Sequence, residues 1–385
     1  MKFQIYGKDF KTLVDRIGGI VPKRTALQVM ECVKIEARGN NVEFSATDST
    51  NYATIKVYAN VYEDGVAWVL LSDLKKILAI NDDIIITASD LKLDIRSSKK
   101  SYEIPCHTDY DDIWIEKPSI GNNNIVCIQS ENKFLKHLSI LNCARSEEEA
   151  NKMMTVFYLD LLNQRIVTLD GYRIGMANLV GGMFASTNAR GLNLDGTVYS
   201  ALKSLIGKTK DDDKSIEVYA NDKYVEFIGE DYVLTSRLLD GEYFNYEKLT
   251  GDVRSGSEYT YRFNTKELLN IAKEYSKVVT KDNKAPMIFY NNNGSVATGV
   301  QVANYRTSDV LENVEAEYGM GHEWYVGVNP RFIMDACGAF SEEAEIKGAY
   351  SFKKPIMIMD ETYEFLILPV NINEDNVEFV KRQVA

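Results

Sequence analysis

Apolar residues recur at helical spacing in three separate stretches of the chain, over residues 9–17, 131–141 and 265–275. In each stretch they fall three or four positions apart, which puts their side chains on one face of a helix. The pattern therefore predicts three short amphipathic helices. The positions that carry it are Phe10, Leu13, Val14, Ile17, Phe134, Leu138, Leu141, Leu268, Ile271, Ala272 and Tyr275.

A second short helix is predicted after each of these, over residues 72–78, 197–206 and 329–337. Pro330 stands in the first turn of the last one, where the missing N–H of proline removes no helical hydrogen bond. Asn264, followed three residues later by Glu267, has the spacing of a capping box at the start of the third amphipathic helix.

Between the helices, apolar and polar residues alternate, which is typical of antiparallel strands with one buried face. The clearest hairpin turn is the run of three asparagines and a glycine that ends at Gly294. The clearest strands are predicted over 42–47, 52–57, 84–88, 215–220 and 223–228.

The order helix, strands, helix recurs three times, with a period of roughly 122 to 134 residues. We therefore expect an α+β chain of three similar domains, over 1–120, 125–250 and 256–385. Turn-rich segments at 117–124 and 250–257 mark the expected boundaries. They are too short to be loose linkers, so we expect neighbouring repeats to pack edge to edge. The alternative is a chance recurrence of helices and strands in an unrelated α+β protein.

The charge of the chain is distributed unevenly. The net charge is −12, which by itself disfavours binding to nucleic acid. The windows that cover the six predicted helices and the loops after them nevertheless carry +11, which leaves −23 on the remainder. Two interpretations stay open: a basic face formed by the helices, or ordinary solvated lysines on helix surfaces.

The composition favours a soluble chain without a membrane span or signal peptide, and we expect it in the cytoplasm. Five cysteines without a Cys-x-x-Cys pair predict reduced, mostly buried thiols. The chain has three histidines, His107, His137 and His322, and no His-Glu-x-x-His motif. Gly207-Lys-Thr lacks the glycine-rich loop of a phosphate-binding site, and the acidic run 211–213 is interpreted as a solvated turn. We expect no catalytic residues, no metal and no cofactor.

Two segments indicate what such a non-catalytic chain binds. Residues 165–177, which contain Leu169-Asp-Gly-Tyr-Arg-Ile174, resemble the central-domain signature of the bacterial β sliding clamp family, the β subunit of DNA polymerase III. Residues 363–372 resemble the apolar carboxyl-terminal strand of the same family. The two motifs occur in the family's order and at its spacing.

The resemblance implies three sliding-clamp domains in each subunit, with antiparallel sheets on the outside and two helices per domain lining a ring. It implies a head-to-tail homodimer that encircles double-stranded DNA without sequence specificity. It also implies a DNA polymerase processivity factor, whose partners are a replicative DNA polymerase, a clamp loader and other proteins with clamp-binding peptides. The alternative is a monomeric clamp-like scaffold that binds peptides and does not encircle DNA.

The resemblance further implies a pocket for apolar peptides between the second and third repeats, with an arginine at its rim. Tyr172, Leu169 and Phe244 depart from the residue types usual in the family, so we expect a more aromatic pocket. The residues expected to form it are Met154, Leu169, Gly171, Tyr172, Arg173, Ile174, Phe244, Lys248, Leu249, Leu366, Ile367, Leu368, Pro369 and Val370.

Other positions match the family's DNA-binding and subunit-contact regions. The basic residues Lys23, Arg24 and Lys203 are the DNA-binding candidates. The expected subunit contact consists of Tyr102, Ile104, Glu274 and Tyr275. Glu274 departs from the apolar type expected there, which predicts weaker ring closure.

Residues 373–385 extend beyond the usual end of the family. We expect a disordered tail. A second hypothesis, motivated by Val377, Phe379 and Val380, is that the tail folds back and shields the pocket.

Overall fold

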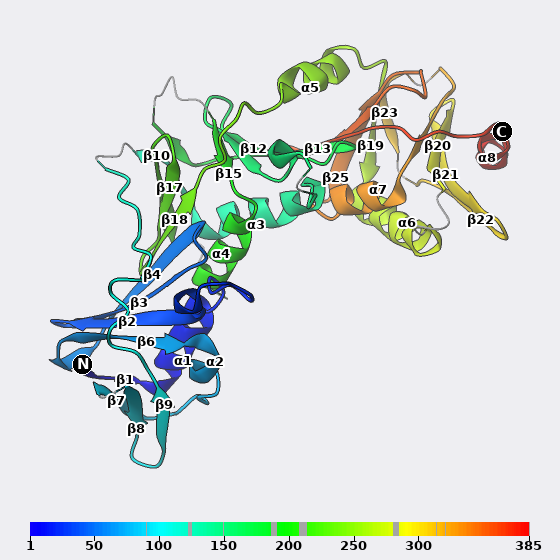
Figure 1. Ribbon diagram of the computed structural model, residues 1–385. Helices are drawn as coiled ribbons and strands as arrows, with labels where there is room; N and C mark the ends of the chain where they lie inside the picture. The colour runs from blue at the N-terminus through cyan, green and yellow to red at the C-terminus, as the bar shows by residue number, and fades with distance from the viewer. Residues whose placement is uncertain are drawn as a thin grey trace. The chain divides into compact units, whose positions relative to one another are not determined.

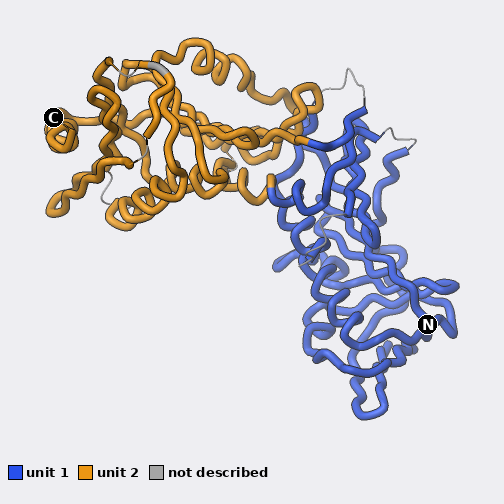
Figure 2. Tube along the Cα trace, turned by 180° about the vertical axis from the view of Figure 1, so that it is seen from behind, with its two compact units in different colours: residues 1–136, 181–240 blue, residues 137–180, 241–385 orange. Residues whose placement is uncertain are grey.

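The computed structural model describes residues 1–89, 91–121, 125–148, 150–185, 191–207, 214–279, 285–312, 314–319 and 321–384. The predicted acidic turn at 211–213 and the end of the predicted boundary at 122–124 lie outside the described residues. The chain divides into two compact units (Figure 2). Unit 1 is Met1–Lys136 with Gly181–Asp240, and unit 2 is His137–Val180 with Gly241–Ala385. No helix in the described part of the chain has the length and apolar content to cross a membrane.

Unit 1 contains two antiparallel sheets (Figure 1). The first has the strand order β5-β1-β7-β8-β9: Asn60–Glu63, Lys2–Tyr6, Asp83–Ser89, Lys92–Arg96 and Ser101–Pro105. The second has the order β14-β10-β16-β17-β18-β4-β3-β2-β6: Met183–Phe184, Ile125–Ser130, Ser215–Ala220, Tyr224–Ile228, Tyr232–Arg237, Asn51–Tyr58, Asn41–Thr47, Cys32–Arg38 and Gly65–Leu70. A short strand, β15 (Leu192–Leu194), forms a bridge to Leu238 through its last residue.

Helices α1 (Gly7–Ile17) and α4 (Thr197–Ile206) pack together over the second sheet of unit 1. Arg16 fastens the pair, because its Nε donates to the Leu205 carbonyl at 2.6 Å and its guanidinium also pairs with Asp231. A side chain at Gly19 would lie 2.0 Å from the Ser204 hydroxyl, so the close approach requires glycine. The remaining helices that begin in this unit are 3-10 helix Gln28–Glu31, α2 (Leu71–Leu74) and α3 (Glu131–Leu141).

Unit 2 also contains two antiparallel sheets (Figure 1). One has the order β11-β12-β13-β27-β26-β25-β19-β23: Phe157–Asp160, Arg165–Leu169, Arg173–Asn178, Tyr363–Ile367, Ile356–Met359, Glu343–Gly348, Tyr259–Asn264 and Glu315–Tyr318. The other has the order β22-β21-β20-β24: Tyr305–Val310, Ser295–Val302, Met287–Asn292 and Trp324–Val328. The helices are α5 (Tyr246–Ser255), α6 (Thr265–Val278), α7 (Pro330–Cys337), α8 (Glu374–Lys381) and the 3-10 turns Asn142–Ala144 and Lys152–Met154.

Most elements that the sequence predicts are present within one to three residues of the expected ends. The Asn264 side chain caps α6 by accepting from the Glu267 N–H at 3.0 Å, although the Glu267 carboxylate accepts from the Glu312 N–H instead of completing a capping box. The predicted hairpin joins β20 to β21, with Asn293 and Gly294 at φ 50° and 91°. Such positive values at both central residues are typical of the turns that match strand twist.

Strands of neighbouring repeats pair with each other, as expected for edge-to-edge packing. In unit 1, β4 pairs with β18 in antiparallel register from Asn51–Ser236 to Ile55–Tyr232. In unit 2, β13 pairs with β27 from Arg173–Ile367 to Ala177–Tyr363. These pairings join one predicted domain to the next by main-chain hydrogen bonds. The three-domain boundaries themselves stay a prediction.

Three sequence expectations about local structure are wrong. The predicted helix over 72–78 is a single turn, α2, that ends at Leu74. The predicted turn-rich boundary at 250–257 is helical through Ser255, because α5 begins at Tyr246. The predicted carboxyl-terminal strand ends at Ile367 rather than Ile372, because the chain leaves β26 there and the Val370 N–H donates to the Gly327 carbonyl.

The carboxyl-terminal extension is neither disordered nor folded over the predicted pocket. It forms α8, whose Val380 is fully buried against Ile288, Tyr290 and Ala297. Val377 and Val380 are three residues apart on α8, and Val384 follows four residues later, just beyond the end of the helix, so this side of the segment is apolar and requires cover. That spacing is the signal in the sequence that our interpretation of the tail overlooked.

Candidate functional site

Unit 2 contains an apolar cavity of about 250 Å³ beside the β12–β13 turn. Ten of the fourteen residues predicted for a peptide pocket line it, and Pro355 is an eleventh lining residue. Those that the prediction identifies are Met154, Leu169, Gly171, Tyr172, Arg173, Ile174, Phe244, Leu249, Leu366 and Leu368. Lys248, Ile367, Pro369 and Val370 do not line it.

The turn between β12 and β13 forms the first wall. Leu169 and Ile174 are paired across its two strands. The Asp170 carboxylate closes the turn by accepting from the N–H groups of Tyr172 and Arg173 at 2.9 and 3.0 Å. Gly171 has φ +87°, which a residue with a Cβ adopts only under strain. The resulting turn places Tyr172 outward, with 67% of its surface exposed.

Arg173 is buried, so our expectation of an arginine at the pocket rim is wrong. Its Nε donates to Asp170 at 3.0 Å and its Nη1 donates to Asp335 of α7 at 2.7 Å. The guanidinium also donates to the Cys143 carbonyl and lies 4.2 Å from the centre of the Phe332 ring. These contacts satisfy the buried charge and fix the turn to α7. Burial raises the pKa of the Cys143 thiol to about 11, so this thiol beside the guanidinium stays uncharged near neutral pH.

The end of β27 forms the second wall. Successive side chains of a strand point to opposite faces, so Leu366 and Leu368 line the cavity while Ile367 is buried on the other side. The Leu368 N–H donates to the Tyr172 carbonyl at 2.9 Å, which joins the two walls. In the antiparallel pair of β26 and β27, Ile356 lies opposite Ile367, and continuing this register by one residue places Pro355 opposite Leu368. The sequence does not show the register of two strands, and for this reason the prediction did not include Pro355.

Helix α5 and the loop before it form the third wall, with Phe244 and Leu249 facing the cavity. The Asn245 side chain caps the helix by accepting from the Lys248 N–H at 3.1 Å. The Tyr246 hydroxyl, at the first helical position, donates to Asp160 of β11 at 2.5 Å. Burial opposes ionisation of Asp160, but the hydrogen bonds from Tyr246 and Asn163 outweigh it and lower the pKa of the carboxyl.

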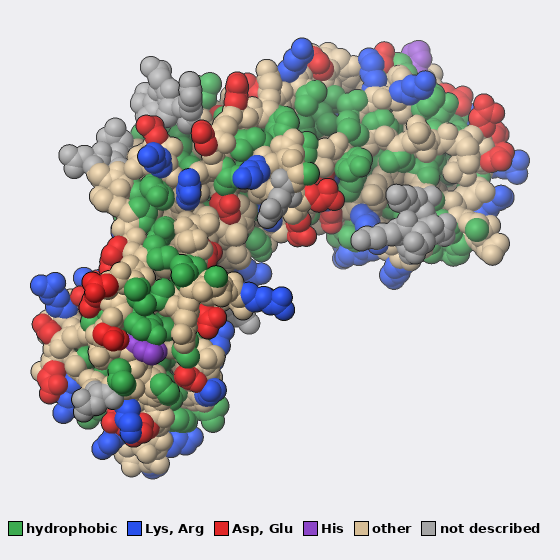
Figure 3. Space-filling view, in the orientation of Figure 1, with side chains coloured by type: hydrophobic (Ala, Val, Ile, Leu, Met, Phe, Trp, Pro, Cys, Tyr) green, Lys and Arg blue, Asp and Glu red, His purple; other side chains and the backbone are tan. Residues whose placement is uncertain are grey.

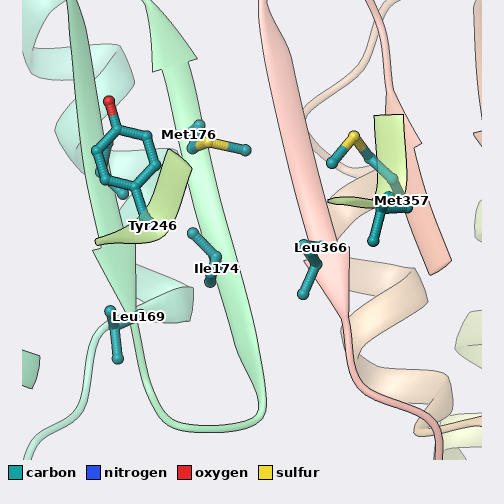
Figure 4. Close-up of a cluster of buried hydrophobic side chains, with 8 residues drawn as sticks. Leu169, Ile174, Met176, Tyr246, Met357 and Leu366 are labelled. Carbon is teal, nitrogen blue, oxygen red and sulfur yellow. The ribbon is translucent and has the colours of Figure 1, made fainter. Parts of the chain in front are cut away.

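A buried apolar cluster supports the cavity from beneath, with Leu169, Ile174, Met176, Tyr246, Met357 and Leu366 labelled in Figure 4. At the opening, Leu249 and Leu368 keep 53% and 40% of their surface exposed. Exposed apolar side chains around a concave apolar floor are characteristic of a site that captures apolar side chains of a ligand.

The predicted DNA-binding residues lie in unit 1 and are exposed. Lys23 and Arg24 are in the segment after α1, and Lys203 is on α4 with its Nζ 5.5 Å from the centre of the Tyr199 ring. Unit 2 offers further exposed cations that the prediction did not include, Lys266, Lys273 and Lys277 on α6 and Arg331 on α7. In Figure 3, lysine and arginine side chains gather over α6, at the lower edge of unit 2.

The predicted subunit-contact residues lie at or near the outer strands of two sheets. Tyr102 and Ile104 are half-buried on β9, the last strand of its sheet. Glu274 is exposed on α6 and accepts from the Tyr305 hydroxyl of the outer strand β22 at 3.1 Å. Tyr275 is fully buried, and its hydroxyl donates to Asp309 of β22 at 2.7 Å. Its side chain therefore belongs to the core and offers no surface to a second subunit.

Within the part of the chain that the structure describes, no three His, Cys, Asp or Glu side chains are grouped as metal ligands. His137 is buried, and its Nδ1 lies 3.0 Å from the Tyr363 hydroxyl. His107 stacks on Tyr110, with their ring centres 4.1 Å apart.

The chain is similar to curated and solved proteins over almost its whole length, although no family model matches it. It is 19% identical to the beta sliding clamp of Caulobacter vibrioides and 21% identical to that of Chlamydia muridarum, covering 97% of this chain and 100% of each relative. Among solved structures, a putative DNA polymerase III beta subunit from Eubacterium rectale has a TM-score of 0.84 at 22% identity. A sliding clamp from Bartonella birtlesii, bound to griselimycin, has a TM-score of 0.83 at 18% identity. Both structural alignments cover 97% of this chain and all of the other.

Proposed function

We propose that this chain, which resembles the β sliding clamps and has their fold over nearly its whole length, is a DNA polymerase processivity factor. Two subunits form a ring that encircles double-stranded DNA, and the ring tethers a replicative polymerase and other replication or repair proteins. The protein acts in the cytoplasm on the nucleoid, a clamp loader opens the ring, and no catalytic step is involved.

The observation that carries this proposal is the apolar cavity beside the β12–β13 turn. Two sequence motifs far apart in the chain, at 165–177 and 363–372, supply two of its walls. A cavity of this size and chemistry accommodates two or three apolar side chains of a peptide rather than a whole protein surface. Such a site suits partners that exchange on one ring, because each needs only a short flexible segment to bind.

The charge distribution supports an interaction with DNA that is independent of sequence. The exposed cations Lys23, Arg24 and Lys203 lie on or next to α1 and α4, whereas the net charge of the chain is −12. Lysine and arginine contacts to phosphates hold duplex DNA without reading its bases. A ring needs only weak contacts of this kind, because encirclement keeps the bound polymerase at high local concentration near its template.

Two outer strands support head-to-tail closure of the ring. β9 in unit 1 and β22 in unit 2 each end a sheet, and the main-chain groups along a sheet's outer edge are open to another strand. Pairing of β9 of one subunit with β22 of the other satisfies those groups at both contacts of a symmetric dimer. Tyr102, Ile104 and Glu274 lie at these edges.

The decisive test compares retention on circular and linear DNA. The protein is loaded with a purified clamp loader and ATP onto a nicked circular plasmid, and free protein is removed by gel filtration. We expect stable retention on the circle and rapid loss after a restriction enzyme linearises it, because a ring slides off free ends. Equal retention on both forms would contradict encirclement, whereas a protein that stays monomeric at all concentrations and still binds apolar peptides would be a clamp-like scaffold.

A further inference from the structure

Helix α8 covers one face of the sheet β22-β21-β20-β24, and it comes from the extension that follows residue 372. Val380 is fully buried against Ile288 and Tyr290 of β20 and Ala297 of β21. Around this centre pack the partly buried side chains of Tyr325, Ile372, Val377, Phe379 and Val384. In Figure 1, α8 lies beside β20 and β21 on the side away from α6.

The alternation of side chains along β21 and β22 places α6 and α8 on opposite faces of this sheet. On β21, the Thr298 side chain faces α6, where its Oγ1 lies 3.2 Å from the Tyr275 hydroxyl, while the next residue, Gly299, faces Val380 of α8. On β22, Asp309 and Tyr305 bond to α6, and Arg306 points the other way. The outer strand is thus held from both sides.

Two contacts connect α8 with the outer strand itself. The Arg306 guanidinium lies 5.9 Å from the centre of the Phe379 ring, within the range of a cation–π contact. The side-chain amide of Gln301 is oriented so that both its oxygen and its nitrogen form hydrogen bonds. The oxygen accepts from Arg306 Nη2 at 2.9 Å, and the nitrogen donates to Asn376 Oδ1 at 3.3 Å. Gln301 thereby links Asn376 of α8 to β22.

The seating of α8 depends on a missing side chain. A Cβ at Gly299 would lie 2.5 Å from Cγ2 of Val380, closer than any normal contact. The missing side chain of Gly299 leaves room on β21 for the Val380 side chain. α8 therefore packs directly on the backbone of β21, the strand next to β22.

We propose that α8 is a buttress for the subunit interface, which holds β22 in the geometry needed to pair with β9 of a second copy of this chain. The inference rests on the proposed ring. A strand that is already fixed loses less conformational entropy when a partner strand adds to it, so the buttress lowers the free energy of association. The buttress also offsets the apolar contact that Glu274 does not provide at the interface. The Glu274 carboxylate accepts a hydrogen bond from the hydroxyl of Tyr305, which lies on β22.

The experiment separates displacement of α8 from loss of the fold. Gly299→Ala drives Val380 away from β21, and the double variant Gly299→Ala/Val380→Ala restores space for α8. Phe379→Ala removes the ring over Arg306, and Glu378→Gln changes an exposed residue of the same helix as a matched control. The dimer dissociation constant is measured by sedimentation velocity, and amide hydrogen exchange is followed across residues 304–311. Circular dichroism confirms that each variant is folded.

We expect Gly299→Ala and Phe379→Ala to raise the dimer dissociation constant about tenfold, which corresponds to about 1.4 kcal/mol of association free energy. Exchange in β22 rises in both, the double variant recovers most of the affinity, and Glu378→Gln behaves as the parent. If the parent dimerises and both variants keep its dissociation constant, the buttress is refuted while the ring stands. Faster exchange in β22 with unchanged dimerisation also refutes it. A parent that is monomeric at all concentrations refutes the ring itself.

Discussion

At the residue scale, the tight turn at Asp170 and Gly171 and the buried Arg173 beside it set the geometry of the cavity. The Asp-Gly pair dictates a tight turn whatever surrounds it, and for that reason the motif at 165–177 located the turn correctly. Arg173 was interpreted as a rim residue, yet it is buried by Asp335 and Phe332 from a helix more than 150 residues away. Tyr275 was misplaced for the same reason, since Asp309 and Thr298 reach it only through the fold.

Peptide binding is expected to depend on the exposed side chains at the opening of the cavity. Leu249→Ala and Leu368→Ala each remove apolar surface that a peptide would bury, and each should weaken binding about tenfold. Stability should change little, because both side chains are largely exposed. The measurement is fluorescence anisotropy with a labelled pentapeptide that carries leucine and phenylalanine.

Leu162→Ala is the matched control for these variants, since Leu162 is 78% exposed in the same unit but does not line the cavity. Equal binding by the control and the two cavity variants would move the peptide site elsewhere.

At the element scale, α5 and α8 are the helices that the sequence analysis did not predict. Thr250–Ser257 contains two glycines and several polar residues, which favour turns, but the Asn245 cap and the burial of Tyr246 and Val253 hold the segment in a helix. The regular helices α1, α3, α4, α6 and α7 were predicted because each carries its own apolar stripe. α5 was missed because tertiary packing there outweighs local preference, whereas the apolar spacing that indicates α8 is present in the sequence and was overlooked.

The Asp160–Tyr246 hydrogen bond is expected to make the anchoring of α5 depend on pH. The pKa of Asp160 is lowered in the folded protein, so the ionised carboxylate stabilises unit 2 above the ordinary pKa of an aspartate, about 3.9, and this contribution is lost as the pH falls through the lowered value. Asp160→Asn should lower the free energy of unfolding by about 1–3 kcal/mol at pH 7. It should also weaken peptide binding, because α5 carries Leu249 into the cavity.

Urea unfolding at pH 7 and near pH 3 measures this effect, with the exposed Glu361→Gln as the control. The parent should lose more stability on acidification than Asp160→Asn does. An identical loss in both proteins would show that the anchor makes no such contribution.

At the scale of the whole molecule, the triple repeat together with the motifs at 165–177 and 363–372 predicted the sliding-clamp fold, and the full-length similarity to solved clamps confirms that fold. The resemblance to the β sliding clamps is confirmed as well. The division into two compact units was not foreseen. It follows from the β4–β18 and β13–β27 pairs, which make each sheet continuous from one repeat into the next. Periodicity locates the repeats along the chain and carries no information on which strands pair across them.

Binding of unloaded protein to duplex DNA is expected to be weak and strongly dependent on salt, because the helix lysines act against a net charge of −12. Lys203→Ala removes one phosphate contact, so the slope of log affinity against log salt concentration should become less negative by about 0.9. Lys56→Ala is the control, since Lys56 is exposed on β4 and points away from α1 and α4, opposite to the buried Ile55. An equal change of slope in Lys203→Ala and Lys56→Ala would contradict a helix surface that faces DNA.

The strand pairs that cross between repeats also determine where the protein yields under mechanical load. Pulling β4 away from β18 breaks a run of main-chain hydrogen bonds and exposes Ala53, Ile55 and Leu234, which are buried together. In the proposed ring, an edge contact between two subunits has no covalent continuity. A motor protein that strains the ring should therefore separate the subunits at one edge while each chain keeps its own sheets intact.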